Sequence, residues 1–247
     1  MGGMAEPAAP DTNAAIWKSD AAIANWLAGM DERERKRADQ FAFMAELLPF
    51  ERDASFTLLD LGAGTGAAAR AIMSYYPRAQ AILADFSPQM MGAGVEVLRP
   101  FEGRYRYVEL NLLAPDWPAA IPTTVDAVVT SQCVHHLDDS HKQNLFRLIL
   151  SHLQPGGWYV NFDPIAPPDP LVATEWQRVN DRLDPAQAYK RTHRTPQEQA
   201  QYENHVRYMI GLDVQVGFLK AAGFEAVDVY WKKLDYVIYG GKRPLAR

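Results

Sequence analysis

The feature that most constrains the fold of this chain is a glycine-rich segment, Leu58–Gly66, with the sequence LLDLGAGTG. An apolar run leads into it and an amphipathic run follows it, which is typical of a buried strand that turns directly into a helix. Glycine is needed where a chain turns sharply and where a Cβ atom would keep a bound molecule away from the backbone. The first N–H groups of the helix have no partner within the helix and present partial positive charge. The segment therefore predicts a strand–turn–helix unit whose turn binds a ligand.

The same segment opens a repeated alternation of strands and helices. Short apolar runs separated by helical patterns indicate a parallel sheet covered on both faces. We expect strands at 56–61, 81–84, 105–110, 125–130 and 158–162, helices at 67–76, 88–99, 140–153 and 212–222, and a turn at 155–157. Two last strands, 226–232 and 234–239, are linked too closely for a crossover helix and must pair antiparallel. The expected fold is α/β: a doubly wound, mostly parallel, seven-stranded Rossmann-like sheet that ends in an antiparallel strand pair.

The remaining segments predict one domain with two additions. Residues 1–12, rich in Gly, Ala and Pro, are expected to form a flexible tail, and residues 13–247 a single domain. Helical patterns within 14–48 precede the first strand and could cover a ligand at the sheet. The polar, proline-punctuated segment at about 164–210 is expected to form a helical lid.

Charge and cysteine content exclude several classes of function. The formal net charge of −5 makes nucleic acid an improbable partner, because such binding depends on clustered Lys and Arg. The densest charged run, 31–37, alternates in sign and is typical of a solvated helix face. The single cysteine, Cys133, allows no intramolecular disulfide. With no apolar run long enough to span a bilayer and no secretion signal, we expect a cytoplasmic protein without membrane contact.

Two classes of cofactor suit the glycine-rich turn. The run Gly62–Ala67 also satisfies a dinucleotide fingerprint, and Asp85, 19 residues after Gly66, is placed to bind ribose hydroxyls in either class. Three features favour S-adenosylmethionine (SAM). Asp60 can address the cationic amino end of SAM, Asn111 can meet an adenine edge, and the closing strand pair is unlike a six-stranded dinucleotide fold.

Together these motifs resemble those of the class I SAM-dependent methyltransferases, particularly the small-molecule branch that includes ubiquinone- and menaquinone-biosynthesis enzymes. The resemblance runs through 56–162 and rests on DLGAGTG at 60–66, LADFSPQM at 83–90, VDAVVTS at 125–131, HHL at 135–137 and LQPGG at 153–157. It implies SAM as cofactor, S-adenosylhomocysteine as product, and a small-molecule methyl acceptor. Many members carry Asp where this chain has Asn111, so we expect the neutral amide of Asn111 to bind adenine in place of a negatively charged carboxylate. The expected cofactor-binding residues are Asp60, Gly62, Ala63, Gly64, Gly66, Asp85, Phe86, Met90, Asn111, Leu112 and Thr130.

Histidines are the candidates for catalysis. A neutral imidazole can remove a proton near pH 7, so His135, His136 and His205 are possible general bases, although each could simply pack. We expect no metal site, because the donors between Cys133 and His141 are contiguous on a short loop, whereas metal sites draw ligands from separated elements. Candidates for the substrate pocket are Trp17, Trp176, Tyr202, His205 and Tyr208.

The expected reaction is in-line displacement at the sulfonium methyl, onto an O, N or C atom of the acceptor. The cofactor carries the reactive chemistry, and the protein aligns the reactants in a dry site. Two alternatives remain open: a SAM-type fold that modifies or binds SAM without methyl transfer, and an NAD-dependent oxidoreductase. The identity of the acceptor depends on the lid, where no motif was found.

Overall fold

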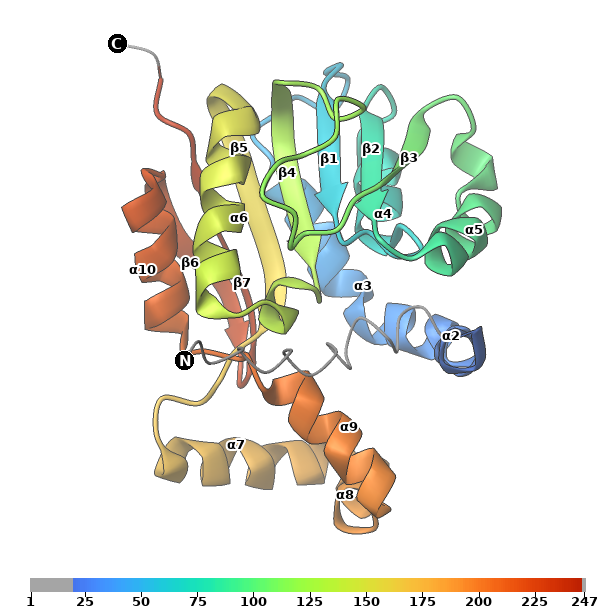
Figure 1. Ribbon diagram of the computed structural model, residues 1–247, viewed down its shortest axis with the longest axis vertical. Coiled ribbons are helices and arrows are strands. Elements are labelled where there is room, and N and C mark those ends of the chain that lie inside the picture. The colour runs from blue at the N-terminus through green and yellow to red at the C-terminus, as the bar shows by residue number, and fades with distance from the viewer. Residues whose placement is uncertain (1–19, 246–247) are drawn as a thin grey trace, which may run out of the picture.

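The computed structural model describes residues 20–245 of the chain. A seven-stranded sheet runs through the molecule in the order β3-β2-β1-β4-β5-β7-β6 (Figure 1). Only β7 runs antiparallel to its neighbours, β5 and β6, and the other pairings are parallel. The predicted sheet and its closing antiparallel pair are therefore confirmed. The strands are β1 (Thr57–Leu61), β2 (Gln80–Asp85), β3 (Tyr105–Glu109), β4 (Val125–Ser131), β5 (Leu153–Pro164), β6 (Glu225–Lys233) and β7 (Tyr236–Lys242).

The helices begin at residues suited to that position. Proline stands in the first turn of α5, α7, α8 and α9, where its fixed φ favours the helix and no N–H is lost. Ser87 and Asp138 cap α5 and α6 by accepting from the backbone N–H of Met90 and His141. The helices are α2 (Asp20–Ala28), α3 (Met30–Glu46), α4 (Ala67–Tyr75), α5 (Pro88–Val97), α6 (Asp139–His152), α7 (Pro170–Leu183), α8 (Pro185–Thr192), α9 (Pro196–Val206) and α10 (Leu212–Ala222), with short 3₁₀ turns η1 (Arg99–Phe101) and η2 (Val134–His136).

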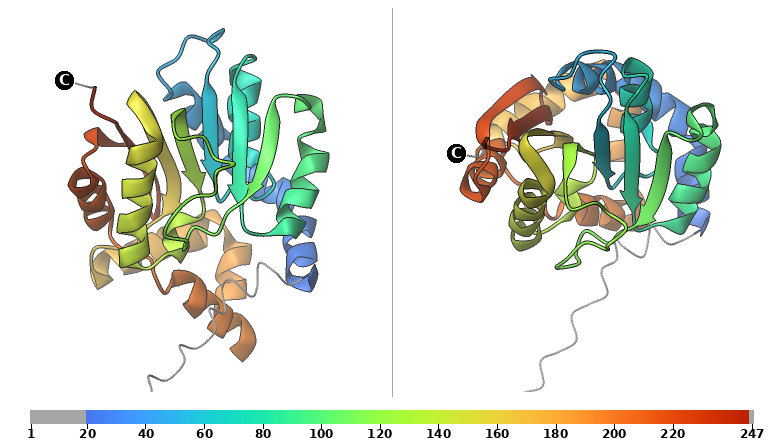
Figure 2. Two further views of the ribbon diagram at one scale, coloured as in Figure 1. Left: turned by 45° about the horizontal axis from the view of Figure 1, so that its top comes forward. Right: turned by 90° about the horizontal axis from the view of Figure 1, so that it is seen from above.

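Alternating strand side chains divide the core into two layers. Leu58 of β1 packs with α3 and α4, whereas Leu59 packs on the opposite face with α6 and α10. Figure 2 shows helices on both faces of the twisted sheet. The expected lid corresponds to α7, α8 and α9, which lie beyond one end of the sheet (Figure 1).

One detail differs from the sequence prediction. Residues 155–157, expected as a turn, lie within β5 as an irregularity, where the register against β4 shifts and Gly156 has a φ of +85°. The buried side of α3 consists of Phe41, Met44 and Ala45. The expected tail, 1–12, lies outside the described residues. Within residues 20–245, no helix is both long and apolar enough to cross a membrane.

The strand order places a crevice at the centre of the sheet. From β1 the chain proceeds outward to β2 and β3, whereas β4 returns to the other side of β1 and continues to β5. Helices on either side of this reversal cover opposite faces, so they diverge at the carboxyl ends of β1 and β4. Ligands of doubly wound sheets bind at such a switch point.

Candidate functional site

A pocket lies at the carboxyl ends of β1, β2 and β4. Its floor is the glycine-rich turn after β1, and its sides come from the segments that follow β2, β3 and β4. Side chains of α2 and α3 cover one side, and His205 of α9 enters from the lid. The sequence expectation that the early helices cover a site at the sheet therefore agrees with the geometry.

The glycine-rich turn needs glycine for two different reasons. Gly62 has a φ of +65°, and a Cβ on it would fall 2.7 Å from Cβ of Cys133. Gly66 has a φ of +83°, and a Cβ on it would fall 2.7 Å from Leu83 and Leu98. L-residues with side chains are strained at these angles, and the close neighbours add a clash. Gly62, Ala63 and Gly64 line the pocket, whereas Gly66 packs against the core and opens α4.

Asp60 lies directly below this turn and is completely buried. Its Oδ2 accepts a hydrogen bond of 3.1 Å from the backbone N–H of Ala69 in the first turn of α4. Its Oδ1 is buried without a hydrogen-bond partner within the described part of the chain. Burial raises the pKa of Asp60 to about 7. A buried carboxylate oxygen without a donor is costly, and a cationic or N–H-bearing ligand would remove that cost.

Asp85 follows β2 and lines the pocket. Its Oδ2 accepts from the N–H of Gly64 at 2.7 Å, and its Oδ1 accepts from the N–H of Ser87 at 2.9 Å. These bonds fix the carboxylate against the glycine-rich turn, although burial raises the pKa of Asp85. A carboxylate held in this way can still accept hydrogen bonds from two adjacent hydroxyls.

The other predicted cofactor residues fall into two groups. Phe86, Met90, Asn111 and Leu112 line the pocket beside Asp85. Thr130 does not line it: its side chain is buried and bonds to Tyr159 and Asn161 at 2.8 and 2.7 Å. The strand alternation explains this placement, because Thr130 points into the layer beneath α6.

The three histidine candidates meet at the lid side of the pocket. His135 and His136 belong to η2, and His205 comes from the last turn of α9. The ring centroids lie 3.9 Å apart for His135 and His136, and 4.7 Å apart for His135 and His205. Burial lowers the pKa of His136 to about 2 and that of His205 to about 4, and it also lowers that of His135. All three imidazoles are therefore neutral at physiological pH and are weak bases.

Of the expected substrate-pocket residues, only His205 lines the pocket among those that the structure describes. Trp176 packs beneath Lys232, whose Nζ lies 4.4 Å from the ring centroid. Tyr202 is 42% exposed and lies under the guanidinium of Arg194. Tyr208 offers its backbone carbonyl to Lys142. Trp17 lies outside the described residues.

Sequence reasoning did not identify which residues of α3 line the pocket. Met30, Arg33, Glu34, Arg37 and Phe41 line it, so the run 31–37, which was expected to be a solvated helix face, is solvated on one side only. The helical period brings these positions to one side, while Asp31, Glu32, Arg35 and Lys36 stay exposed. The spacing of residues 30, 33, 34, 37 and 41 by three or four positions places them on one helix face and could have identified it. The alternating charges of 31–37 instead suggested that the helix was solvated.

Comparison with known proteins agrees with this geometry. Residues 59–159 match the family model described as a methyltransferase domain. Methyltransferase str2 of Strobilurus tenacellus is 28% identical over 147 residues, which cover 59% of this chain and 46% of the relative. The ubiquinone/menaquinone biosynthesis C-methyltransferase UbiE of Syntrophotalea carbinolica is 30% identical over 116 residues, covering 47% of each. The chain spans about half the length of these curated relatives.

Solved structures share the fold at low sequence identity. An O-methyltransferase family protein from Burkholderia thailandensis aligns with a TM-score of 0.68 at 16% identity, covering 94% of this chain and 62% of that one. Human N-acetylserotonin methyltransferase, solved in complex with SAM, aligns with a TM-score of 0.63 at 18% identity, covering 98% and 61%.

The central crevice, the glycine-rich turn and the antiparallel closing pair define the Rossmann-like fold of a class I methyltransferase. Similarity of fold alone does not identify a methyltransferase, but residues 59–159 also match the methyltransferase domain in sequence. The chain resembles class I SAM-dependent methyltransferases in sequence and fold.

Proposed function

We propose that this protein transfers the sulfonium methyl group of SAM to a small-molecule acceptor. One observation carries the proposal. A single pocket at the switch point of the sheet joins the glycine-rich turn and Asp85 on one side to three neutral imidazoles on the other. This arrangement suits a nucleoside-type cofactor at one end and a polar organic acceptor at the other.

The residues of this chain fit SAM. Asp60 does not line the pocket, but its Oδ1 has no hydrogen-bond partner within the described residues, and the amino end of SAM would supply a cation to it. The Asp85 carboxylate is fixed for paired hydroxyls, and Phe86, Met90 and Leu112 offer apolar surface for a flat base. Asn111 keeps its side chain at the pocket, with Oδ1 accepting from the N–H of Leu113 at 3.0 Å. When bound, SAM supplies an electrophilic methyl group on a positively charged sulfur.

The protein contributes alignment and exclusion of water. Arg33, Arg37 and Phe41 of α3 line the same pocket as η2. An acceptor held between α3 and the imidazoles would share the pocket with a cofactor at the glycine-rich turn, and alignment of the two reactants supplies much of the rate enhancement in a group transfer. We propose that His135, His136 and His205 form the part of the pocket wall that faces the reacting group of the acceptor. Because these imidazoles are weak bases, they can take a proton only from an acceptor whose acidity is raised.

The relatives support a small organic acceptor. They include an O-methyltransferase of Penicillium aethiopicum and the C-methyltransferase UbiE. The net charge of −5 is also unfavourable for a nucleic-acid acceptor. A cytoplasmic location is part of this proposal and can be checked by cell fractionation.

The test is a paired binding and turnover measurement. Isothermal titration should show binding of SAM and S-adenosylhomocysteine to the full chain, with NAD(H) as the competing ligand. Methyl-labelled SAM incubated with a panel of phenols, amines and activated carbon acids should then yield a labelled product. Tight binding of NAD(H) without SAM binding would support an oxidoreductase instead. SAM that binds but never loses its methyl would support a SAM-modifying or SAM-binding protein.

A further inference from the structure

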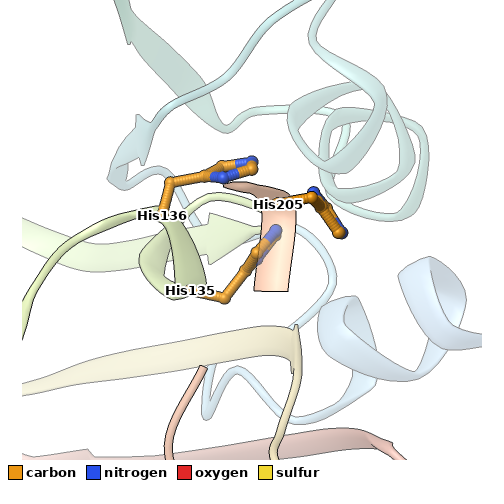
Figure 3. A group of neighbouring side chains, drawn as sticks. All are labelled: His135, His136 and His205. Carbon is orange, nitrogen blue, oxygen red and sulfur yellow. The ribbon is translucent and has the colours of Figure 1, made fainter. Parts of the chain in front are cut away.

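The imidazoles of His135, His136 and His205 come from two elements far apart in the sequence. The first two lie on η2 after β4, and the third lies at the end of α9 in the lid. Figure 3 shows the three rings turned toward one another. Each ring offers a nitrogen that lies within 4.8 Å of a nitrogen of both others.

Asp163 fixes the orientation of His135. Its Oδ1 accepts from Nδ1 of His135 at 2.7 Å, and its Oδ2 accepts from the backbone N–H of the same residue at 2.8 Å. Both side chains are almost completely buried. The carboxylate therefore selects the tautomer with hydrogen on Nδ1 and leaves a lone pair on Nε2. That Nε2 is buried and has no hydrogen-bond partner within the described residues.

Lys142 ties the two elements together. Its buried ammonium group donates to the carbonyl of Leu137, just after η2, and to the carbonyl of Tyr208, just after α9. The segment that carries His205 is thus bonded to the segment that carries His136. The three imidazoles are brought together by the fold itself, before any ligand arrives.

We propose that His135, His136 and His205 bind one divalent transition-metal ion of the zinc class through three ring nitrogens. Imidazole suits zinc, copper, iron and nickel, and three protein ligands with one open position are typical of catalytic zinc sites. Metal-binding histidines usually donate a hydrogen bond from the other ring nitrogen to a carboxylate or carbonyl, and Nδ1 of His135 makes such a bond to Asp163. The orphaned Nε2 of His135 would gain the partner that it lacks.

The site requires only a small contraction. Zinc–nitrogen bonds of ~2.0–2.1 Å in a tetrahedron place the nitrogens about 3.3 Å apart. The present separations extend to 4.8 Å, and the side chain of His205 is exposed enough to rotate inward. The reason for expecting no metal was that the donors between Cys133 and His141 are contiguous. The fold adds a ligand from α9, which removes that objection.

The open position of the ion would face the pocket. Its role there rests on the proposed function. An acceptor O–H that binds to the ion releases its proton to solvent and remains as the anion. The anion then forms a bond to the methyl carbon as the carbon–sulfur bond breaks, and the sulfonium becomes a neutral thioether. The ion would thus make the acceptor acidic enough to lose its proton without a strong base in the pocket.

The alternative is a group of stacked imidazoles that bind the acceptor without metal. To separate the two, the full chain without an affinity tag is treated with a chelator, dialysed, and titrated with Zn²⁺ by calorimetry. Co²⁺ titration monitors the visible absorption of four-coordinate cobalt. We expect one equivalent of tight binding, weakened at least ~100-fold in His205→Ala and ~10–100-fold in Asp163→Asn. The exposed position of His205 makes its truncation compatible with folding, which circular dichroism verifies.

The matched control removes the other three histidines of the chain, in the triple variant H141A/H152A/H193A. It should bind Zn²⁺ as the unsubstituted chain does. The proposal is overturned if the folded, chelator-treated chain binds no Zn²⁺ or Co²⁺, if His205→Ala binds as tightly as the unsubstituted chain, or if the control loses binding. Failure of SAM to bind would refute the proposed function while leaving the metal result intact. Full methyl transfer by the metal-free protein would overturn the role of the ion in activating the acceptor.

Discussion

Asp163 accepts hydrogen bonds from both the ring Nδ1 and the backbone N–H of His135, at 2.7 and 2.8 Å. The carboxylate at the end of β5 thus sets the position of η2 relative to the sheet and the tautomer of the ring. The Asp163 carboxylate therefore fixes both the backbone and the side chain of His135. The histidine side of the pocket consequently depends on Asp163, a residue that does not line it.

Replacing Asp163 with alanine should lower the free energy of unfolding by about 2–5 kcal/mol, because it leaves a buried N–H and a buried ring nitrogen without acceptors. Urea denaturation measures the change. The comparison variant is Asp169→Ala, an exposed cap of α7 that should cost about 1 kcal/mol. Equal effects of the two variants would contradict the dominant role of the Asp163 contact.

Replacing Asp85 with alanine should weaken SAM binding by ~1–3 kcal/mol, the scale of charge-assisted hydrogen bonds. The measurement is isothermal titration with S-adenosylhomocysteine and SAM. Glu109→Ala supplies the control, because this exposed carboxylate stands opposite Asp85 in the register of β2 and β3. An unchanged binding curve for Asp85→Ala in a folded protein would remove this residue from the cofactor site.

The stability of the unliganded protein should fall as pH rises between about 4 and 7 because of Asp60. Its pKa is about 7 in the folded chain, against an ordinary value of 3.8. In that interval the Asp60 carboxyl is ionised in the unfolded chain but still protonated in the folded chain. Each rise in pH therefore stabilises the unfolded state relative to the folded state. Above pH 7 both states are ionised and the contribution is constant. The loss is on the order of a few kcal/mol.

Asp60→Asn has no such titration, so the difference in unfolding free energy between it and the unsubstituted protein should change with pH across the same window. Denaturation at a series of pH values measures this difference. The variant should become relatively more stable as pH rises. A difference that does not vary with pH would show that Asp60 is already ionised in the folded protein at low pH.

Gly62→Ala should destabilise the fold by more than the ~1–2 kcal/mol expected for a left-handed backbone, because the added methyl also meets Cys133. Gly92→Ala in α5 is the opposite case. Its Cβ would meet nothing within 4 Å, and it should be neutral or stabilise by about 0.5–1 kcal/mol. Thermal unfolding of both variants tests the pair, and a tolerated Gly62→Ala would show that the turn can relax away from Cys133.

The parts of the molecule that follow local rules were predictable. The glycine-rich turn, Asp85 and the closing strand pair all depend on spacing within one or two elements, and their positions agree with the sequence. The pocket face of α3 was missed because its charges alternate in sign, which is also the pattern of a solvated helix. The partnership of Asp163 with His135 joins residues 28 positions apart and depends on how β5 lies beside β4. No local periodicity encodes it.

Of the residues that were expected to line the substrate pocket from the lid, only His205 lines the pocket among the described residues. Tyr202 and His205 lie within one turn of α9, yet only His205 lines the pocket. Which of two neighbouring polar aromatic residues faces inward depends on the rotation of α9 about its axis. Contacts from distant parts of the chain hold this region in place, such as the hydrogen bond from Lys142 to the carbonyl of Tyr208 just after α9, and the helical period does not encode them.

The lid enters the sheet topology between β5 and α10, with both of its ends on the same side of the molecule (Figure 1). Such a segment can be exchanged as a cassette without altering any strand pairing. Transplanting residues 165–211 between related chains would therefore alter acceptor choice while leaving cofactor affinity in place. Diversification of this protein by recombination would require only one pair of crossover points.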